Sequence, residues 1–399
     1  MLDLTYVRGQ FPAFAEPSLQ GQAFFENAGG SYTCQPVIDR RFRFYHQRKV
    51  QPYAPYPAAQ AGGAEMDEAR TRLAGLLNIA PDELSFGPST TQNTYVLSQA
   101  VREVMRPGEA IIVTNQDHEA NSGAWRRLAD HGIELREWKV DPETGQLDPA
   151  ALEPLLDESV RLVCFPHCSN VVGEINPVAE ITALAHAAGA WVCVDGVSYA
   201  PHGFPDLETL GCDIYLFSAY KTYGPHQGIM AIRRELAELL PNQAHGFNGD
   251  TLYKKFTPAG PDHAQVAACA GMVDYIEALA DHHGVAPREV AGLMHAHEVA
   301  LMRPLLDYLG TKNSVRLLGP TDPARRAPTV ALALQRPANA VASELARHGI
   351  MAGGGDFYAR RPLQAMGIDP GLGVLRLSFV HYTSPAEVDQ LLAALDAVL

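Results

Sequence analysis

Cysteine is scarce in this chain, with six among 399 residues. That number is too small for a disulfide framework, and Cys164, Cys193 and Cys212 lie within apolar runs, as small buried hydrophobic residues do. Cys164 and Cys168 flank His167, but no second pair of ligand residues follows at the spacing of a zinc site. We therefore expect buried cysteines and no metal site.

Long apolar runs and an excess of positive charge are also missing. No uninterrupted hydrophobic stretch is long enough to span a bilayer, and residues 1–6 lack the basic and apolar pattern of a secretory signal. The formal net charge of −14 disfavours a nucleic-acid partner, because phosphate backbones attract clustered Lys and Arg. We expect a globular cytoplasmic protein with no membrane and no nucleic-acid partner.

The middle of the chain alternates short apolar runs with helical periodicity, which is typical of crossover units in a largely parallel α/β sheet. The apolar run at 227–232 follows the run at 214–217 after a short turn. These two strands should therefore pair antiparallel, which predicts a mixed sheet. The expected strands are Ala110–Thr114, Ile133–Trp138, Arg161–Phe165, Trp191–Val194, Ile214–Phe217 and Gln227–Ile232, and a helix is expected over 178–188.

A second, smaller domain of α+β type is predicted from a change of pattern after about residue 260. We expect a large domain over residues 18–258 and a smaller domain made of residues 1–17 and 259–399. The proline- and glycine-containing stretch 53–63 is predicted to be an irregular loop. The expected elements of the second half are helices at 265–281 and 289–308 and strands at 329–334 and 374–379.

Lys221 lies in a polar, glycine-ended turn directly after the apolar run 213–217. Burial at such a strand end lowers the pKa of an amine and makes it a usable nucleophile. A second apolar run, 191–194, ends at Asp195. An acid and an amine at neighbouring strand ends suit a pyridoxal-phosphate site, where lysine forms the Schiff base and aspartate keeps the ring nitrogen protonated.

Other polar side chains follow strands of the same expected sheet. Thr90 and Thr91 open a helix whose hydroxyl and backbone N–H groups suit a phosphate. His118 is placed to stack on a planar ring, and Asn170 to donate to a ring hydroxyl or a substrate carboxylate. Each residue alone has an ordinary explanation as a cap, loop or turn residue. Together they lie at the carboxyl ends of separate strands, where open α/β sheets bind ligands.

These segments resemble the class V aminotransferases, the cysteine desulfurase-like branch of the pyridoxal-phosphate fold type I enzymes. The resemblance runs nearly end to end, and it implies a fold type I transferase-like architecture with pyridoxal 5'-phosphate as cofactor. The matching segments are FENAGG at 25–30 (family D-N-A-A), the pair at 90–91 (T-T), DHEAN at 117–121 (E-H-H-A-N), SNVVG at 169–173 (S-N-V-L-G), DG at 195–196 (D-G-A-Q) and SAYKTYGP at 218–225 (S-G-H-K-x-Y-G-P).

The resemblance implies a role for each matching residue. Lys221 is the internal aldimine lysine, Asp195 the pyridinium partner and His118 the residue stacked on the ring. Arg376 is the clamp for the substrate α-carboxylate, because a guanidinium fork fits two oxygens. The further implied contacts are Thr90, Thr91, Asn170, Ser198, Ser218, Tyr220 and Gly260 to the cofactor, and Asn27, Ala28 and Asn170 to the substrate.

Departures from the family pattern bear on which reaction we expect. Tyr220 replaces the histidine that usually precedes the lysine, Ser198 replaces a glutamine, and Gly260 offers only its backbone where the family's G-T-P-N segment reaches the partner subunit's phosphate. Residues 352–361 contain no cysteine where desulfurases carry a loop thiol. In that segment Tyr358, Arg360 and Arg361 are either contacts to a substrate side chain or part of a solvated surface turn.

We therefore expect a pyridoxal-phosphate enzyme that acts on an amino acid, with Lys221 as Schiff base and acid/base. The favoured reaction is β-elimination by a C–S lyase, since this branch includes lyases without the loop cysteine. An aminotransferase and an amino-acid epimerase are alternatives, and a non-catalytic cofactor-binding scaffold is a second one. The family resemblance also implies a homodimer.

Overall fold

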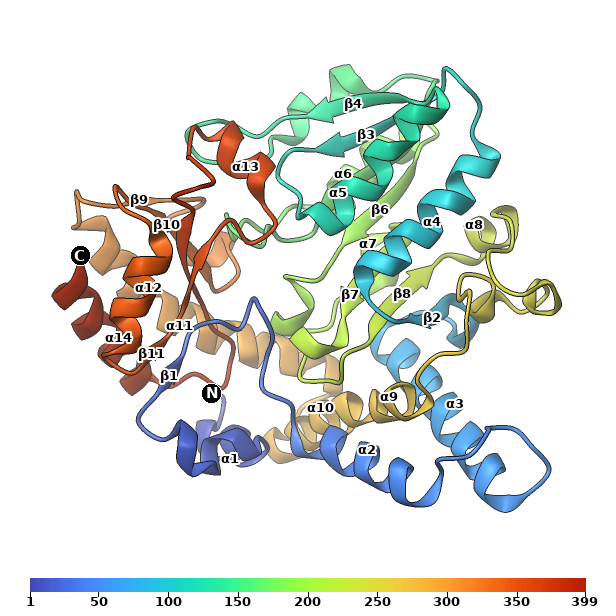
Figure 1. The fold of residues 1–399 in the computed structure, drawn as a ribbon, viewed down its shortest axis with the longest axis horizontal. Coiled ribbons are helices and arrows are strands. Elements are labelled where there is room, and N and C mark those ends of the chain that lie inside the picture. Colours follow the sequence, from blue (N-terminus) through green and yellow to red (C-terminus); the bar gives the residue numbers. More distant parts are fainter.

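A seven-stranded sheet forms the centre of the protein in the computed structural model, which describes residues 1–399 (Figure 1). Its strand order is β2-β8-β7-β6-β5-β3-β4, and β8 pairs antiparallel with β2 and β7 while the other pairs are parallel. The predicted mixed sheet is confirmed, with β2 as a strand that the sequence pattern missed. The strands are β2 (Leu84–Gly87), β3 (Ala110–Thr114), β4 (Glu134–Trp138), β5 (Val160–Pro166), β6 (Trp191–Asp195), β7 (Ile214–Ser218) and β8 (Gly228–Ile232).

Helices cover both faces of this sheet. Along β3, Ile111 and Val113 pack with α4 and α5 in one core, whereas Ala110 and Ile112 pack with α3, α6 and α10 in another. Successive side chains of a strand point to opposite faces, so burial of both faces explains the continuous apolar runs. The helices flanking the sheet are α2 (Gln35–Gln47), α3 (Pro57–Leu77), α4 (Thr90–Val104), α5 (Glu119–Arg126), α6 (Val178–Ala187), α7 (Leu207–Leu210), α8 (Arg234–Leu239), α9 (His263–Ala268) and α10 (Ala270–His283), together with α1 (Leu4–Gly9) near the N-terminus.

A four-stranded antiparallel sheet of order β12-β13-β10-β9 forms the second unit, with a separate core. The helices α11, α12 and α14 contribute to this core, as do Ala23 and Phe25 near the N-terminus. A parallel two-stranded ladder joins β1 to β11. The elements are β1 (Ala23–Phe24), α11 (Val290–Gly310), β9 (Arg316–Leu317), β10 (Thr329–Ala333), α12 (Ala338–Ala346), β11 (Ile350–Met351), β12 (Gly353–Gly355), α13 (Arg360–Ala365), β13 (Val374–Ser378) and α14 (Pro385–Val398).

The hydrophobic cores show which segments pack with which unit. Val7 and Phe11 belong to the larger core, as do the apolar side chains of α9 and α10. Within α11, Met294 packs in the larger core and Leu301 in the smaller one. We therefore propose that α11 bridges the two units, with the division inside this helix.

The prediction of an irregular loop at 53–63 was wrong from Pro57 onward, where α3 begins. Gly62 and Gly63 lie inside this helix because of close packing. A Cβ atom on Gly63 would lie 2.5 Å from the ring of Tyr53. The stretch expected as one helix at 265–281 is two helices, α9 and α10, which meet at Cys269.

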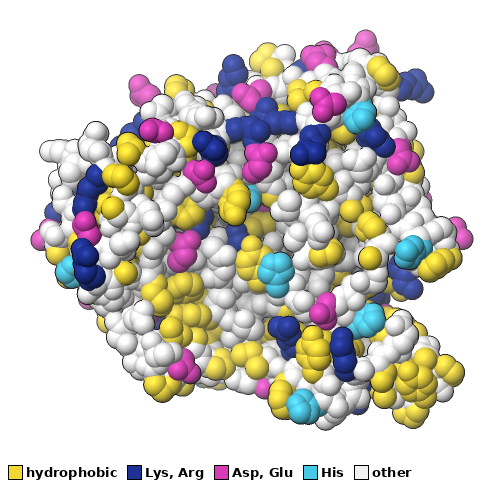
Figure 2. Space-filling view, viewed as in Figure 1, with side chains coloured by type: hydrophobic (Ala, Val, Ile, Leu, Met, Phe, Trp, Pro, Cys, Tyr) yellow, Lys and Arg dark blue, Asp and Glu magenta, His cyan; other side chains and the backbone are white.

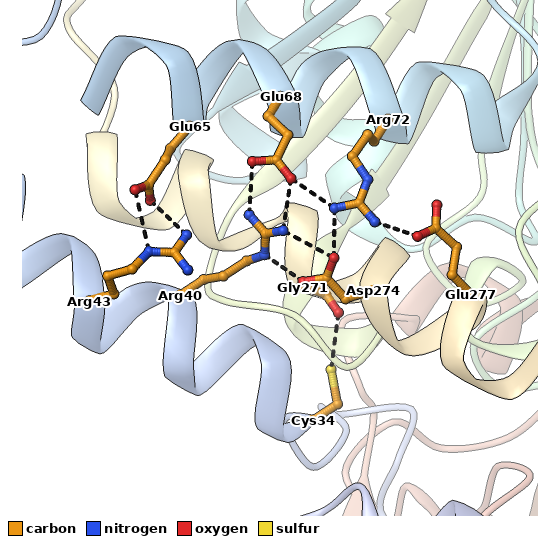
Figure 3. Close-up of polar contacts among 9 residues, drawn as sticks. All are labelled: Cys34, Arg40, Arg43, Glu65, Glu68, Arg72, Gly271, Asp274 and Glu277. Atoms are coloured by element: carbon orange, nitrogen blue, oxygen red, sulfur yellow. Dashed lines mark hydrogen bonds and ion pairs between the residues drawn. The ribbon is translucent and has the colours of Figure 1, made fainter. Parts of the chain in front are cut away.

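Ion pairs hold α2, α3 and α10 together (Figure 3). Arg40 of α2 donates to Glu68 of α3 at 2.8 Å and to Asp274 of α10 at 2.5 Å. Arg72 of α3 also contacts both carboxylates. A connected network of this kind stabilises helix packing more than isolated surface pairs do.

Charges of both signs are interspersed on the face shown in Figure 2, without a large basic patch. None of the helices is both long and apolar enough to cross a membrane.

Candidate active site

Lys221 lies immediately after β7, at the end of a short 3-10 turn over Ala219–Lys221. Its side chain lines a cavity of about 220 Å³ at the carboxyl ends of the parallel strands. Burial lowers the pKa of Lys221 from 10.5 to about 8, and the positive charge of Arg376 adds to this effect. The site therefore holds an amine that is partly deprotonated near neutral pH.

Asp195 ends β6, the strand that pairs with β7, and it lines the same cavity. Its Oδ1 accepts a hydrogen bond from the backbone N–H of Val197 at 2.9 Å. Burial raises the pKa of this carboxyl to about 6, against the opposing effects of that hydrogen bond and of Lys221. A cationic ring placed beside it would favour the carboxylate form.

His118 caps the start of α5, where its Nδ1 accepts a hydrogen bond from the N–H of Ala120 at 3.0 Å. Burial, together with the charges of Lys221 and Arg376, lowers the pKa of His118 to about 3. The imidazole is therefore neutral at physiological pH, and its ring lines the cavity. A neutral ring in this position suits stacking on a planar ligand.

The first turn of α4 and the residue before it also line the cavity. Ser89 is the N-cap, and the Thr90 hydroxyl lies 2.7 Å from that of Ser218 at the end of β7. A Cβ atom on Gly228 would lie 2.5 Å from the carbonyl carbon of Ser89, so glycine lets α4 start close against β8. Hydroxyls at a helix N-terminus suit an anion such as a phosphate. Thr91, Ser198 and His226 also line this cavity.

Tyr220 and His226 stack on each other, with ring centroids 4.8 Å apart and an angle of 6° between the planes. Both rings line the cavity beside Lys221. Sequence reasoning singled out Tyr220 but missed His226, which directly follows the matched segment ending at Pro225.

A second cavity, of about 520 Å³, adjoins the first, since both are lined by Thr91, His118, Asn170, Tyr220 and Lys221. Here the Nδ2 of Asn170 donates to the carbonyl oxygen of Phe357 at 3.0 Å, while its Oδ1 is buried without a partner. An unpaired buried acceptor is costly, so this atom marks a place where a ligand donor fits.

Arg376, from β13, brings the smaller unit into this second cavity, and its side chain is buried. Its Nη2 donates to Oε1 of Glu26 at 2.6 Å, and its Nη1 donates to the Asn170 carbonyl oxygen at 3.3 Å. The Phe357 ring covers the guanidinium at 3.8 Å. Ala28 also lines this cavity. The sequence did not point to Glu26 or Phe357, because both join the site through contacts with Arg376 that no local pattern shows.

Asn27 is engaged by hydrogen bonds within the protein. Its Nδ2 donates to the carbonyl oxygen of Ser378 at 3.2 Å, and its Oδ1 accepts from the Tyr382 hydroxyl. Asn27 lines neither cavity. These bonds to the protein engage its amide, and a contact of Asn27 to the substrate stays a prediction.

Gly260 lies apart from Lys221, at a different cavity of about 320 Å³ shared with Tyr53, Arg70 and Tyr253. The contact implied for it was to a partner subunit's phosphate, so its role stays a prediction.

No reactive thiol lies at the site. All six cysteines are buried. Cys168 lines the first cavity, but its Sγ donates to the Gly173 carbonyl oxygen at 3.5 Å, and burial raises the pKa of its thiol to about 12. A thiol with so high a pKa is a poor nucleophile. No three or more His, Cys, Asp or Glu side chains are grouped to hold a metal ion.

The segment without cysteine, which contains Phe357 and Tyr358, folds over the second cavity. These two residues have φ angles of 50° and 57°, a left-handed conformation that is uncommon outside glycine. The Tyr358 carbonyl oxygen accepts from the N–H of Glu119, and Arg361 forms an ion pair with the Glu119 carboxylate. Tyr358 thus lines the cavity, while Arg361 fastens the segment to α5.

Comparisons with known proteins identify the family to which this fold and this site belong. The model of the aminotransferase class V family matches residues 23–391. The aminotransferase-like protein FGM3 of Gibberella zeae is 34% identical, with 98% of each chain covered. A cysteine desulfurase of Serratia proteamaculans is 32% identical over 98% of this chain and 97% of its own. The chain therefore belongs to the class V aminotransferase family.

Solved structures agree on the fold. A cysteine desulfurase from Thermococcus onnurineus has a TM-score of 0.88 at 24% identity, covering 100% of this chain and 98% of its own. The cysteine desulfurase CsdA of Escherichia coli has a TM-score of 0.84 at 24% identity with the same coverage. The predicted fold type I architecture is confirmed.

The protein is an enzyme of this family and its cofactor is pyridoxal 5'-phosphate, as predicted. The donor set fits the group: an amine of lowered pKa, a buried carboxylate, a neutral imidazole and hydroxyls at a helix start all line one cavity. The orphaned Oδ1 of Asn170 lies at the boundary with the second cavity, where a ligand donor is needed.

Proposed function

We propose that this enzyme is a C–S lyase that removes a sulfur leaving group from Cβ of an amino acid by β-elimination. Lys221 is proposed to attach the cofactor through Nζ, and Asp195 to pair with the ring nitrogen. When bound, pyridoxal phosphate supplies an electron sink for the bond broken at Cα. The products are the thiol, ammonia and a 2-oxo acid, with one water consumed.

Lys221 is proposed to move the proton at Cα of the substrate. The support is its buried position between Asp195 and Arg376 and its pKa, which burial lowers to about 8. A base with a pKa near the working pH combines a useful amine fraction with enough basicity.

The cofactor contacts are proposed to follow the cavity lining. Thr90, Thr91, Ser198 and Ser218 would hold the phosphate, His118 would stack on the ring, and Tyr220 would lie beside them. In the adjoining cavity, Arg376 would bind the substrate α-carboxylate, with Asn170 and Ala28 next to it. These assignments rest on position and donor type.

One observation favours elimination over desulfuration: the site keeps its amine and its guanidinium but has no reactive thiol. Burial raises the pKa of the Cys168 thiol to about 12. The segment over the site, residues 352–361, contains no cysteine. A desulfurase needs a nucleophile to accept sulfur, whereas β-elimination releases the thiol without one.

Transamination is the second candidate, because a relative of 34% identity is named an aminotransferase-like protein. Epimerisation, by reprotonation of Cα from the other side, is a further alternative. A cofactor-binding scaffold without turnover is less well supported, since a scaffold has no need for Arg376.

The experiment is a panel of amino acids, including S-substituted cysteines, given to the purified holoenzyme. Release of a thiol and pyruvate in equal amounts supports the lyase. Amine transfer to an added 2-oxo acid without pyruvate overturns it in favour of the aminotransferase, and racemised substrate favours the epimerase. The Lys221→Ala variant is the control for background reaction with free cofactor.

A homodimer is also proposed. Hydrophobic side chains gather at the lower right of the face in Figure 2, over the connection between α2 and α3. The exposed ones on α2 and this connection include Phe42, Tyr45, Val50, Tyr53 and Tyr56. An exposed apolar patch of this kind is typical of a protein interface. Sedimentation at several concentrations tests the assembly, and a Phe42→Glu, Tyr45→Glu variant should shift it toward the monomer.

A further inference from the structure

Glu26 forms an ion pair with the guanidinium of Arg376, the group proposed to bind the substrate carboxylate. It follows β1, and its Oε1 lies 2.6 Å from Nη2 of Arg376, an arginine that is 3% exposed. The Nη1 of Arg376 donates to the carbonyl oxygen of Asn170, and Phe357 covers the guanidinium face. The Nε of Arg376 is buried without a partner and remains a free donor. A two-oxygen contact through both terminal nitrogens, however, competes with Glu26 for the guanidinium.

Two glycines make room for Glu26. A Cβ atom on Gly353 would lie 2.6 Å from Oε2 of Glu26, and one on Gly29 would lie 2.9 Å from Oε1. The Oε2 atom is buried without a partner, while the side chain as a whole is 29% exposed. The carboxylate therefore fits its position tightly, yet it has an open side through which to swing away.

The other charged side chains around the second cavity are paired with a partner or exposed to solvent. Glu119 is paired with Arg361, and His118 is neutral because burial lowers its pKa to about 3. Arg360 is 69% exposed and contacts Asp356 at 3.7 Å. Lys221 also lines this cavity, but under the proposed function it is taken up by the cofactor, so no buried cation other than Arg376 is available for a second substrate carboxylate.

We propose that Glu26 determines substrate specificity: it holds Arg376 until a substrate carboxylate displaces it, and its charge then disfavours acidic side chains. The preferred substrates are amino acids with a neutral or cationic side chain. This proposal rests on the proposed function, because it assumes that Arg376 binds the substrate carboxylate.

The test uses two unreactive acids that lack an amino group, propionate for a neutral side chain and succinate for an acidic one. Isothermal titration calorimetry measures their affinity for the holoenzyme, and the absorption of bound cofactor is recorded in parallel. Glu26→Gln should bind propionate about tenfold more tightly than the unaltered enzyme, since the competing ion pair is lost. Succinate should gain about threefold more than propionate, because the repelling charge is also gone.

Two further variants separate the two roles of Glu26. Glu26→Asp keeps the charge but is shorter by one methylene, so propionate should gain affinity while succinate stays disfavoured. The matched control is Glu134→Gln, which removes a carboxylate that pairs with Arg136 and lines neither cavity. This control should change either affinity by less than about twofold.

The outcomes distinguish this proposal from the proposed function. Equal propionate affinity in the unaltered and Glu26→Gln enzymes, or no measurable binding to either, overturns the role of Glu26. A protein that binds no cofactor, or an Arg376→Ala variant that binds propionate as well as the unaltered enzyme, overturns the proposed function itself.

Discussion

The hydroxyls of Thr90 and Ser218 lie 2.7 Å apart and join the first turn of α4 to the end of β7. Lys221 follows Ser218 within one turn, so this hydrogen bond also fixes the distance between the proposed phosphate site and the amine. The geometry of cofactor attachment is thereby built into the packing of α4 on the sheet.

Replacing Thr90 by valine should weaken cofactor binding by about tenfold, since one buried hydroxyl contact to an anion is lost. Titration of the apoenzyme with pyridoxal phosphate measures the change. The matched control is Thr94→Val, one turn further along α4, whose hydroxyl donates to the Thr90 carbonyl oxygen and lines neither cavity. Equal losses in both variants would show that helix stability, and not phosphate contact, is responsible.

The rate of cofactor capture by the apoenzyme should rise with pH and level off above about 8. In the proposed attachment, only the free amine of Lys221 reacts with the cofactor aldehyde, and burial lowers the pKa of this amine from 10.5 to about 8. The amine fraction therefore increases as the pH rises through that value. Stopped-flow absorption from pH 6 to pH 10 follows the reaction. A midpoint near pH 10 would contradict the buried position of Lys221.

His118 has two separable roles, as a ring in the cavity and as the N-cap of α5. His118→Asn keeps a side-chain acceptor for the Ala120 N–H and loses the ring, so cofactor affinity should fall with little loss of thermal stability. His118→Phe keeps a ring and loses the cap, which should cost about 1 kcal/mol of stability. Melting curves of the apoprotein and cofactor titrations together check both. A loss of stability in the asparagine variant alone would reverse these assignments.

Gly228→Ala should abolish or strongly reduce cofactor binding. The added Cβ would lie 2.5 Å from the Ser89 carbonyl carbon, so α4 must shift away from β8. Gly75→Ala on the exposed side of α3 is the control, because nothing lies within 4 Å of its Cβ position. This control should retain cofactor and gain up to about 1 kcal/mol of stability. Normal cofactor affinity in Gly228→Ala would show that the start of α4 does not position the phosphate.

The sequence was most informative where local rules and tertiary structure agree. The parallel strands are buried on both faces, so their apolar runs were visible, and the polar residues after them fell at one sheet edge. Lys221, Asp195 and His118 were found this way, and the structure brings them together at one cavity.

Other features depend on contacts that no local pattern contains. Gly62 and Gly63 resemble loop residues, yet they lie in α3 because Tyr53 and Phe44 pack against them. The amide of Asn27 is hydrogen-bonded to Ser378 and Tyr382, which are far away in the chain, so these contacts could not be predicted from the sequence. Glu26 pairs with Arg376, which lies 350 positions away in the chain, so no local pattern indicates this contact.

The most direct measurement of the central claim is borohydride reduction of the holoenzyme followed by mass spectrometry of its peptides. We expect a yellow protein whose reduced cofactor remains covalently attached to Lys221, with no attachment in the Lys221→Ala variant. A colourless protein, or a reduced adduct on any other lysine, would contradict it.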